Sequence, residues 1–189
     1  MNDITTQLSG ATNILLQEPP LGQGREVCTS LLFADVDEPN VLFVSYTRQA
    51  TACIDQVVDE RIGNIGVITV GQAAATDDDR ATTESVSTPS DLTGLGIKMG
   101  QFISTWEPPV CVCFESLTSM LQYVDSRTAY EFLHAITGQI HAADARSHFH
   151  VDPAAHDEKT IASITSLFDA TLSLAGEEPS VRRRKLLES

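Results

Sequence analysis

One loop near the N-terminus has the spacing of a phosphate-binding motif. An apolar segment, Asn13 to Gln17, is followed by the loop Glu18 to Glu26 and by an apolar helical run from Val27 to Phe33. A strand, a glycine-containing loop, a basic residue and a helix form the frame of the nucleotide-binding pattern G-x-x-x-x-G-K-[ST]. On that frame Gly24 is the last glycine and Arg25 takes the place of the lysine.

Other residues of this loop depart from the pattern. Pro19 stands at the first glycine position, and Glu26 replaces the serine or threonine that would hold Mg²⁺. Proline removes an N–H donor, and a carboxylate repels phosphate although it can bind Mg²⁺. Two interpretations remain: a turn that no longer binds phosphate, or an unusual nucleotide site formed by Gly22, Gly24, Arg25 and Glu26.

A second candidate lies where a later apolar segment ends in a carboxylate. Val110 to Phe114 is continuously apolar, as in a central parallel strand, and Glu115 follows directly. A carboxylate in this position orients Mg²⁺ or its water in phosphoryl-transfer enzymes. If a nucleotide binds, we expect Glu115 to help hold Mg-ATP.

A third candidate is an alternating segment in the last third of the chain. On a strand His148, His150 and Asp152 share one face. Two histidines and a carboxylate have the composition of a Zn²⁺ or Fe²⁺ site, so a metal-dependent hydrolase centred on these residues is one alternative. A polar loop at a strand end is the other.

The cysteines suggest no site of their own. They stand at positions 28, 53, 111 and 113 and form no C-x-x-C pair. Zinc sites usually contain such pairs or Cys/His clusters in loops. We therefore expect the four cysteines to be reduced, buried and structural.

Short apolar runs that alternate with helical stretches must position these candidates. They predict an α/β fold with a mostly parallel central sheet flanked by helices. Strands are expected at 13–17, 41–45, 65–70, 110–114, 147–151 and 171–174, and helices at 50–61, 92–106, 126–143 and 156–168. We expect an N-terminal segment at 1–12, one domain at 13–175 with a flexible acidic loop at 76–90, and a mobile tail at 176–189 that carries the basic cluster Arg182 to Lys185.

Composition limits the class of protein. The chain has 189 residues, and 26 acidic against 12 basic side chains give a net charge of −14. This charge disfavours nucleic-acid binding, which depends on basic groups, and is typical of proteins from a high-salt cytoplasm. The sequence contains no apolar run of about 18 residues, so no membrane span is predicted. It also shows no secretory signal, so a cytoplasmic location is expected.

Several segments together carry a resemblance to a known superfamily. They are residues 13–26, 41–46, 91–96, 110–123 and 148–153, of which 110–123 is similar to the strand that ends in DSLT in KaiC-like proteins. The chain resembles the RecA/KaiC-like P-loop ATPase superfamily, especially small haloarchaeal RecA-like proteins of unknown function. The resemblance implies a three-layer sandwich and a catalytic glutamate after the second strand, where this chain has Ser45-Tyr46-Thr47-Arg48.

These departures favour one function over two others. We expect a noncatalytic regulatory or protein-interaction module with a degenerate Walker A loop, no cofactor, and ATPase activity that is absent or very weak. The first alternative is a divergent ATP-binding protein or slow ATPase that holds Mg-ATP, and the second is the metal-dependent hydrolase. The expected partner is an unknown protein or, because the superfamily forms rings, a second copy of the chain; neither nucleic acid nor a membrane is expected.

Overall fold

The structure, a computed structural model, describes residues 2–20, 22, 24–58, 60–73 and 77–184. Its described strands form one sheet of eight, in the order β4-β3-β2-β5-β6-β1-β7-β8. In chain order the elements are α1 (Asn2–Leu8), β1 (Asn13–Gln17), α2 (Gly24–Leu32), β2 (Asn40–Ser45), α3 (Ala50–Val57), β3 (Ile65–Val70), β4 (Thr82–Val86), α4 (Leu92–Thr105), β5 (Val110–Glu115), α5 (Leu117–Met120), α6 (Ser126–Ala142), β6 (Arg146–Val151), η1 (Pro153–Ala155), α7 (Glu158–Thr165), β7 (Ala170–Ser173) and β8 (Ser180–Arg183).

The described strands run parallel to their neighbours except for the last pair, β7 and β8, which is antiparallel. The central strands are apolar along their whole length because helices cover both faces of the sheet. All the parallel strands end at one edge, which is where open α/β sheets bind ligands. The predicted fold class, α/β with a mostly parallel sheet between helices, is confirmed.

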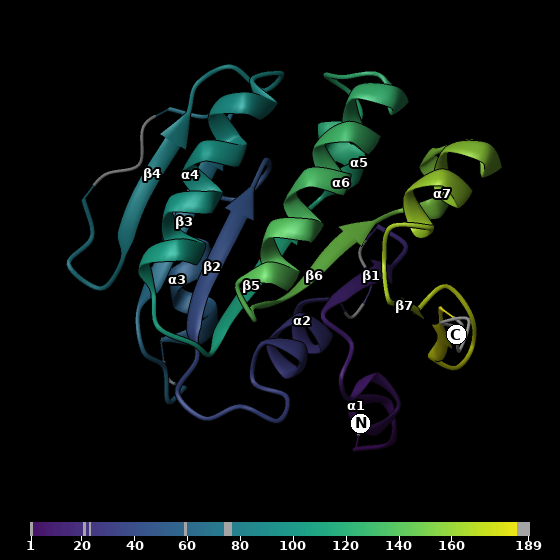
Figure 1. Cartoon of the computed structure of the whole chain (residues 1–189), viewed down its shortest axis with the longest axis horizontal. Helices are drawn as coiled ribbons and strands as arrows, with labels where there is room; N and C mark the ends of the chain where they lie inside the picture. Colours follow the sequence, from purple (N-terminus) through teal and green to yellow (C-terminus); the bar gives the residue numbers. More distant parts are fainter. Residues whose placement is uncertain (1, 21, 23, 59, 74–76, 185–189) are drawn as a thin grey trace.

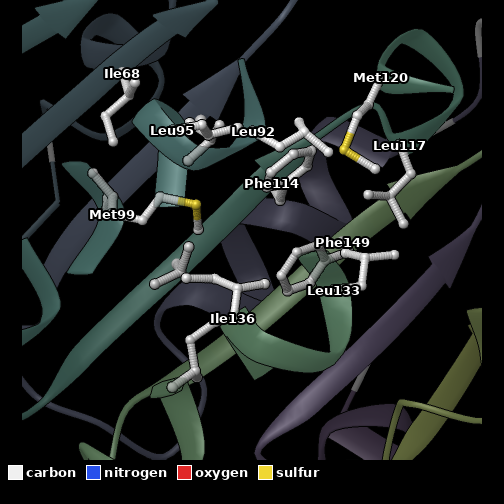
Figure 2. Close-up of a cluster of buried hydrophobic side chains, with 14 of the residues drawn as sticks. Ile68, Leu92, Leu95, Met99, Phe114, Leu117, Met120, Leu133, Ile136 and Phe149 are labelled. Carbon is white, nitrogen blue, oxygen red and sulfur yellow. The ribbon is translucent and has the colours of Figure 1, made fainter. Parts of the chain in front are cut away.

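Helices divide between the two faces of the sheet (Figure 1). Helices α4, α6 and α7 pack on one face, and α2 and α3 pack on the other. Under α4 and α6 lies an apolar core, in which Leu95, Leu133 and Ile136 surround Phe114 and Phe149 (Figure 2). This core holds the sheet rigid behind the edge where the parallel strands end.

Two segments that were expected to be mobile contain strands of the central sheet. Residues 76–90 were expected to be a flexible loop, but they contain β4, which pairs with the edge of β3. Its threonines favour extended backbone, and Val86 is buried against the core. Likewise, the expected mobile tail contains β8, and Arg183 of that strand donates a hydrogen bond to the carbonyl of Ser9 (2.9 Å). Residue 76 and Lys185 lie outside the described residues.

Candidate functional site

A cleft of about 890 Å³ lies beyond the carboxyl ends of β1, β2, β5 and β6. Its walls come from the loop after β1, the start of α2, and the loops after β2 and β5. The structure brings together in this cleft all the residues predicted for a nucleotide site: Gly22, Gly24, Arg25, Glu26 and Glu115.

The loop after β1 folds one of its own carboxylates onto the start of α2. The backbone N–H of Gly22 donates to the carbonyl of Pro19 (3.2 Å), which closes a turn. At Gly24, the first residue of α2, a Cβ atom would lie only 1.4 Å from Oε2 of Glu18. Any residue larger than glycine there would have to displace the Glu18 carboxylate. A negative charge at a helix N-terminus is favourable, since it complements the helix dipole.

Glu115, at the end of β5, is held by residues of the loop after β2. The hydroxyl of Ser45 donates to Oε2 of Glu115 (2.7 Å), and Nε of Arg48 lies 3.7 Å from Oε1. The guanidinium of Arg48 also donates to Oε1 of Gln56 on α3 (2.8 Å). The predicted Mg²⁺-binding carboxylate therefore already has a cation and a hydroxyl as partners.

Strand β6 places the two predicted metal-binding histidines side by side but leaves the aspartate apart from them. The rings of His148 and His150 lie 5.2 Å apart, and both side chains are buried. Asp152 instead accepts a hydrogen bond from the backbone N–H of Ala154 (3.0 Å) and caps the short turn η1. The two histidines therefore contact other potential metal ligands in place of Asp152.

Two cysteines complete what we call the cysteine–histidine cluster, formed by Cys28, Cys113, His148 and His150. Cys28 comes from α2, and Cys113 comes from β5, where it is the register partner of His148. Sγ of Cys28 lies 3.3 Å from Sγ of Cys113 and 3.1 Å from Nε2 of His148. Sγ of Cys113 lies 3.5 Å from Nε2 of His150. All four ligand atoms lie within 4.8 Å of one another, and all four residues are buried.

Glu18 connects the loop after β1 to this cluster. Its Oε1 lies 2.7 Å from Nδ1 of His150. A carboxylate only accepts hydrogen bonds, so Nδ1 of His150 carries the proton and Nε2 is turned toward the sulfur atoms. Burial acts to lower the pKa of His150, but hydrogen bonds to Cys28 and Glu18 outweigh burial and raise the pKa to about 10.

The four cysteines differ in acidity. A hydrogen bond from Cys113 is the main reason that the pKa of Cys28 falls well below its usual value, against the effect of burial. Burial raises the pKa of Cys113, and the nearby Cys28 adds to that rise. Burial also raises the pKa of Cys53 to about 12 and that of Cys111 to about 11. Among these four described thiols, only Cys28 is therefore shifted toward the reactive thiolate.

The sequence predicted the histidines of the cluster and missed its cysteines and Glu18. All four cysteines are free and buried, as expected, but Cys28 and Cys113 contact the imidazoles rather than apolar side chains alone. One signal was available: Cys111 and Cys113 alternate on one strand as the two histidines do on another. That signal becomes a site only when the two strands are neighbours, which the sequence does not state.

The sheet, its helices and the loop between β1 and α2 define a RecA-like fold. Solved structures that share it include two that are about a tenth identical to this chain, a likeness that shows the fold alone. A Pyrococcus horikoshii OT3 protein is 10% identical with a TM-score of 0.65, covering 96% of this chain and 91% of its own. The flagellar accessory protein FlaH from Methanocaldococcus jannaschii is 11% identical with a TM-score of 0.55, covering 95% of this chain and 81% of its own.

Sequence comparison assigns the chain to a family that has no known role. It belongs to the Family of unknown function (DUF7504), which matches residues 11–174. No curated protein matches the sequence. Among the described residues, no helix combines the length and the apolar character that crossing a membrane requires.

Proposed function

We propose that this chain is a RecA-like module that does not turn over ATP and that acts as a regulatory or interaction component. One observation carries the proposal: the carboxylate of Glu18 rests on Gly24, the first residue of α2. In phosphate-binding loops a phosphate lies at the N-terminus of the corresponding helix, where it accepts hydrogen bonds from backbone N–H groups and is stabilised by the helix dipole. Here a carboxylate of the chain competes for that place and repels a second anion.

The rest of the loop supports the same conclusion. Pro19 and Pro20 have no N–H to offer a phosphate oxygen. Arg25 and Glu26 are both exposed at the mouth of the cleft. A planar guanidinium does not replace a lysine ammonium wrapped in the loop, and Glu26 adds negative charge beside it.

The residues around Glu115 argue against hydrolysis as well. Phosphoryl transfer depends on a positioned metal ion and on a group that orients the attacking water. Glu115 is engaged by Ser45 and Arg48, so a metal ion would have to compete with the Arg48 cation. The segment after β2, where the superfamily places a catalytic glutamate, supplies that arginine instead.

A module that does not hydrolyse ATP can still act by binding another molecule. One structural neighbour is described as a flagellar accessory protein. We propose a protein partner, or a second copy of the chain, in a cytoplasm of high salt; the net charge of −14 opposes nucleic acid as the partner.

Calorimetry tests the proposal. Purified protein in molar KCl is titrated with ATP and with ADP, with and without Mg²⁺, and thermal unfolding is followed in parallel. We expect neither heat nor thermal stabilisation at millimolar nucleotide. Micromolar, Mg-dependent binding would instead support the divergent ATP-binding alternative.

Variants would settle that alternative. If a nucleotide binds in the cleft, Arg25→Ala and Glu115→Ala should abolish binding. Arg127→Ala is the matched control, because this exposed arginine of α6 pairs with Glu131 outside the cleft. Binding lost in the cleft variants and kept in the control would show a working nucleotide site. A turnover assay would then test the noncatalytic proposal, and measurable hydrolysis would contradict it.

A further inference from the structure

We propose that the cysteine–histidine cluster is a metal site that binds one zinc ion with tetrahedral geometry and joins α2 to β5 and β6. The inference is independent of the nucleotide question, because it rests on buried groups at the floor of the cleft rather than on the loop at its mouth.

The spacing of the ligand atoms suits such a site. Zinc binds sulfur at about 2.3 Å and nitrogen at about 2.0–2.1 Å, so neighbouring ligand atoms of a tetrahedron lie about 3.3–3.8 Å apart. The contacts in the cluster measure 3.1 Å and 3.5 Å between sulfur and nitrogen and 3.3 Å between the two sulfur atoms, so they lie within or slightly below this range. The sulfur–sulfur distance is far longer than a disulfide bond of about 2.05 Å. Small movements of side chains would therefore complete the tetrahedron.

The orientation of the side chains points inward to one centre. Both imidazoles turn Nε2 toward a sulfur atom, His148 toward Cys28 and His150 toward Cys113. Two sulfur and two nitrogen ligands in tetrahedral positions are diagnostic of zinc, or of iron in a sulfur site. Oxygen-binding cations such as Mg²⁺ and Ca²⁺ are disfavoured by the same set.

Glu18 supplies the outer support that metal-binding histidines usually have. A ligating histidine commonly donates its other ring N–H to a carboxylate, which fixes the tautomer and the ring orientation. The 2.7 Å contact between Nδ1 of His150 and Glu18 reproduces this arrangement. Because Glu18 also rests on Gly24, a bound metal would hold the loop after β1 in place.

Burial favours a structural site over a catalytic one. The exposed fractions are 2% for Cys28, 2% for Cys113, 3% for His148 and 7% for His150. Structural zinc sites have four protein ligands, whereas catalytic sites keep one position for water or substrate. The cluster offers four protein ligands, so it fits a structural site. It therefore differs from the catalytic hydrolase site predicted on His148, His150 and Asp152.

The cluster is a polar island whose groups contact one another and Glu18 within an apolar layer. The surrounding face of the sheet is apolar, with Val41, Phe43 and Val67 nearby in the same layer. Polar groups buried in such a layer cost free energy unless they are paired, and apolar residues would pack there more simply. The groups come from three distant parts of the chain, so a shared ligand would connect elements that are remote in sequence.

Metal analysis tests the proposal directly. The protein is produced in zinc-supplemented medium, purified without chelator in a phosphine reductant, and measured by inductively coupled plasma mass spectrometry. We expect about one zinc ion per chain. Cys28→Ser and His148→Ala should lose it. Cys111→Ala and His141→Ala should keep it, because the first is a buried cysteine outside the cluster and the second an exposed histidine on α6.

A second measurement covers variants that fail to fold. Wild-type protein stripped of metal is titrated with Co²⁺, which absorbs strongly in tetrahedral sulfur coordination and shows thiolate charge-transfer bands. We expect saturation at about one equivalent and reversal by zinc. Neither bound zinc nor a cobalt spectrum in reduced, folded protein would overturn the proposal, as would metal that the cluster variants retain.

Glu18→Gln tests the supporting role of the carboxylate. This variant keeps all four ligands, and loss of an outer-shell partner typically weakens metal affinity by about 10–100-fold. Competition with a chromophoric chelator measures the change. An unchanged affinity would show that Glu18 does not orient His150. Nucleotide binding by the wild type would leave these results untouched, so the two proposals can fail separately.

Discussion

The two faces of the central sheet use the same strands for different purposes. In β5, Phe114 belongs to the apolar core under α4 and α6, whereas Cys113 lies on the side of α2. In β6, Phe149 and His148 are divided in the same way. The two phenylalanine rings stack at 5.1 Å. Because side chains alternate along a strand, a step of one residue separates close apolar packing from a cluster of sulfur and nitrogen ligands.

The comparison shows two ways of stabilising one sheet. On the apolar face, stability grows with the area removed from water and with close packing, so it depends on volume. On the opposite face, the cysteine–histidine cluster places four polar groups among apolar residues, and those four groups stabilise the fold only when they are partnered. The first face should respond to truncation of a side chain, and the second to the presence of a metal.

Leu133→Ala should give the largest loss. Leu133 is fully buried in the apolar core (Figure 2). Its truncation leaves a cavity and should lower the free energy of unfolding by about 2–5 kcal/mol. Urea unfolding measures the loss. Ile97→Ala, at a position that is 59% exposed on α4, is the control and should stay within about 0.5 kcal/mol. Similar losses in both variants would contradict the division between core and surface.

Zinc should separate the two faces. At a free zinc concentration about 100 times the dissociation constant, linkage predicts stabilisation of about 2.7 kcal/mol. Wild type and Leu133→Ala should gain equally, because Leu133 lies on the other face of the sheet, whereas Cys113→Ala should gain little. Urea unfolding with and without zinc, in reductant, measures the gain. An equal gain in Cys113→Ala would place the metal outside the cysteine–histidine cluster.

Local patterns explain why the fold could be predicted from the sequence. The continuous apolar run from Val110 to Phe114 signals a strand covered on both faces, and the spacing of Leu92, Leu95 and Met99 signals a helix with one buried side. Both signals depend on neighbours in sequence. The strand β4 was missed because its residues are mostly polar, and its position depends on the open edge of β3 rather than on its own pattern.

Only half of the cysteine–histidine cluster could be predicted, because the other half depends on contacts between residues that are distant in sequence. His148 and His150 are two residues apart, so alternation alone places them together. Cys28 and Cys113 join them only because α2 packs across β5 and β6, a contact between segments 85 residues apart in the chain. Asp152 satisfies the same alternation, yet the strand ends before it and its side chain caps a turn. Which residues belong to the cysteine–histidine cluster therefore depends on the order of the strands and on where each strand ends. A single sequence fixes neither.

Asn13→Ala should cost less than the loss of Leu133. Asn13 is a buried polar residue on the apolar face, and its amide donates to the carbonyl of Thr137 (3.1 Å) and accepts from the hydroxyl of Ser147 (2.6 Å). Alanine would leave both partners buried without it, at a cost of about 1–3 kcal/mol. Urea unfolding measures this, with the exposed Gln101→Ala as control. A loss below about 0.5 kcal/mol would show that water replaces the amide.

Cys111→Ala should have the smallest effect and is the sharpest test of the comparison. Cys111 and Cys113 are both buried on the same face of β5, two residues apart, but only Cys113 touches the histidines. We expect Cys111→Ala to cost about 1 kcal/mol in unfolding experiments, with zinc content unchanged. Cys113→Ala should cost a similar amount in metal-free protein and far more when zinc is present. If the two variants behave alike in zinc, the sulfur atoms of this face serve packing alone, and its chemistry does not differ from that of the apolar core.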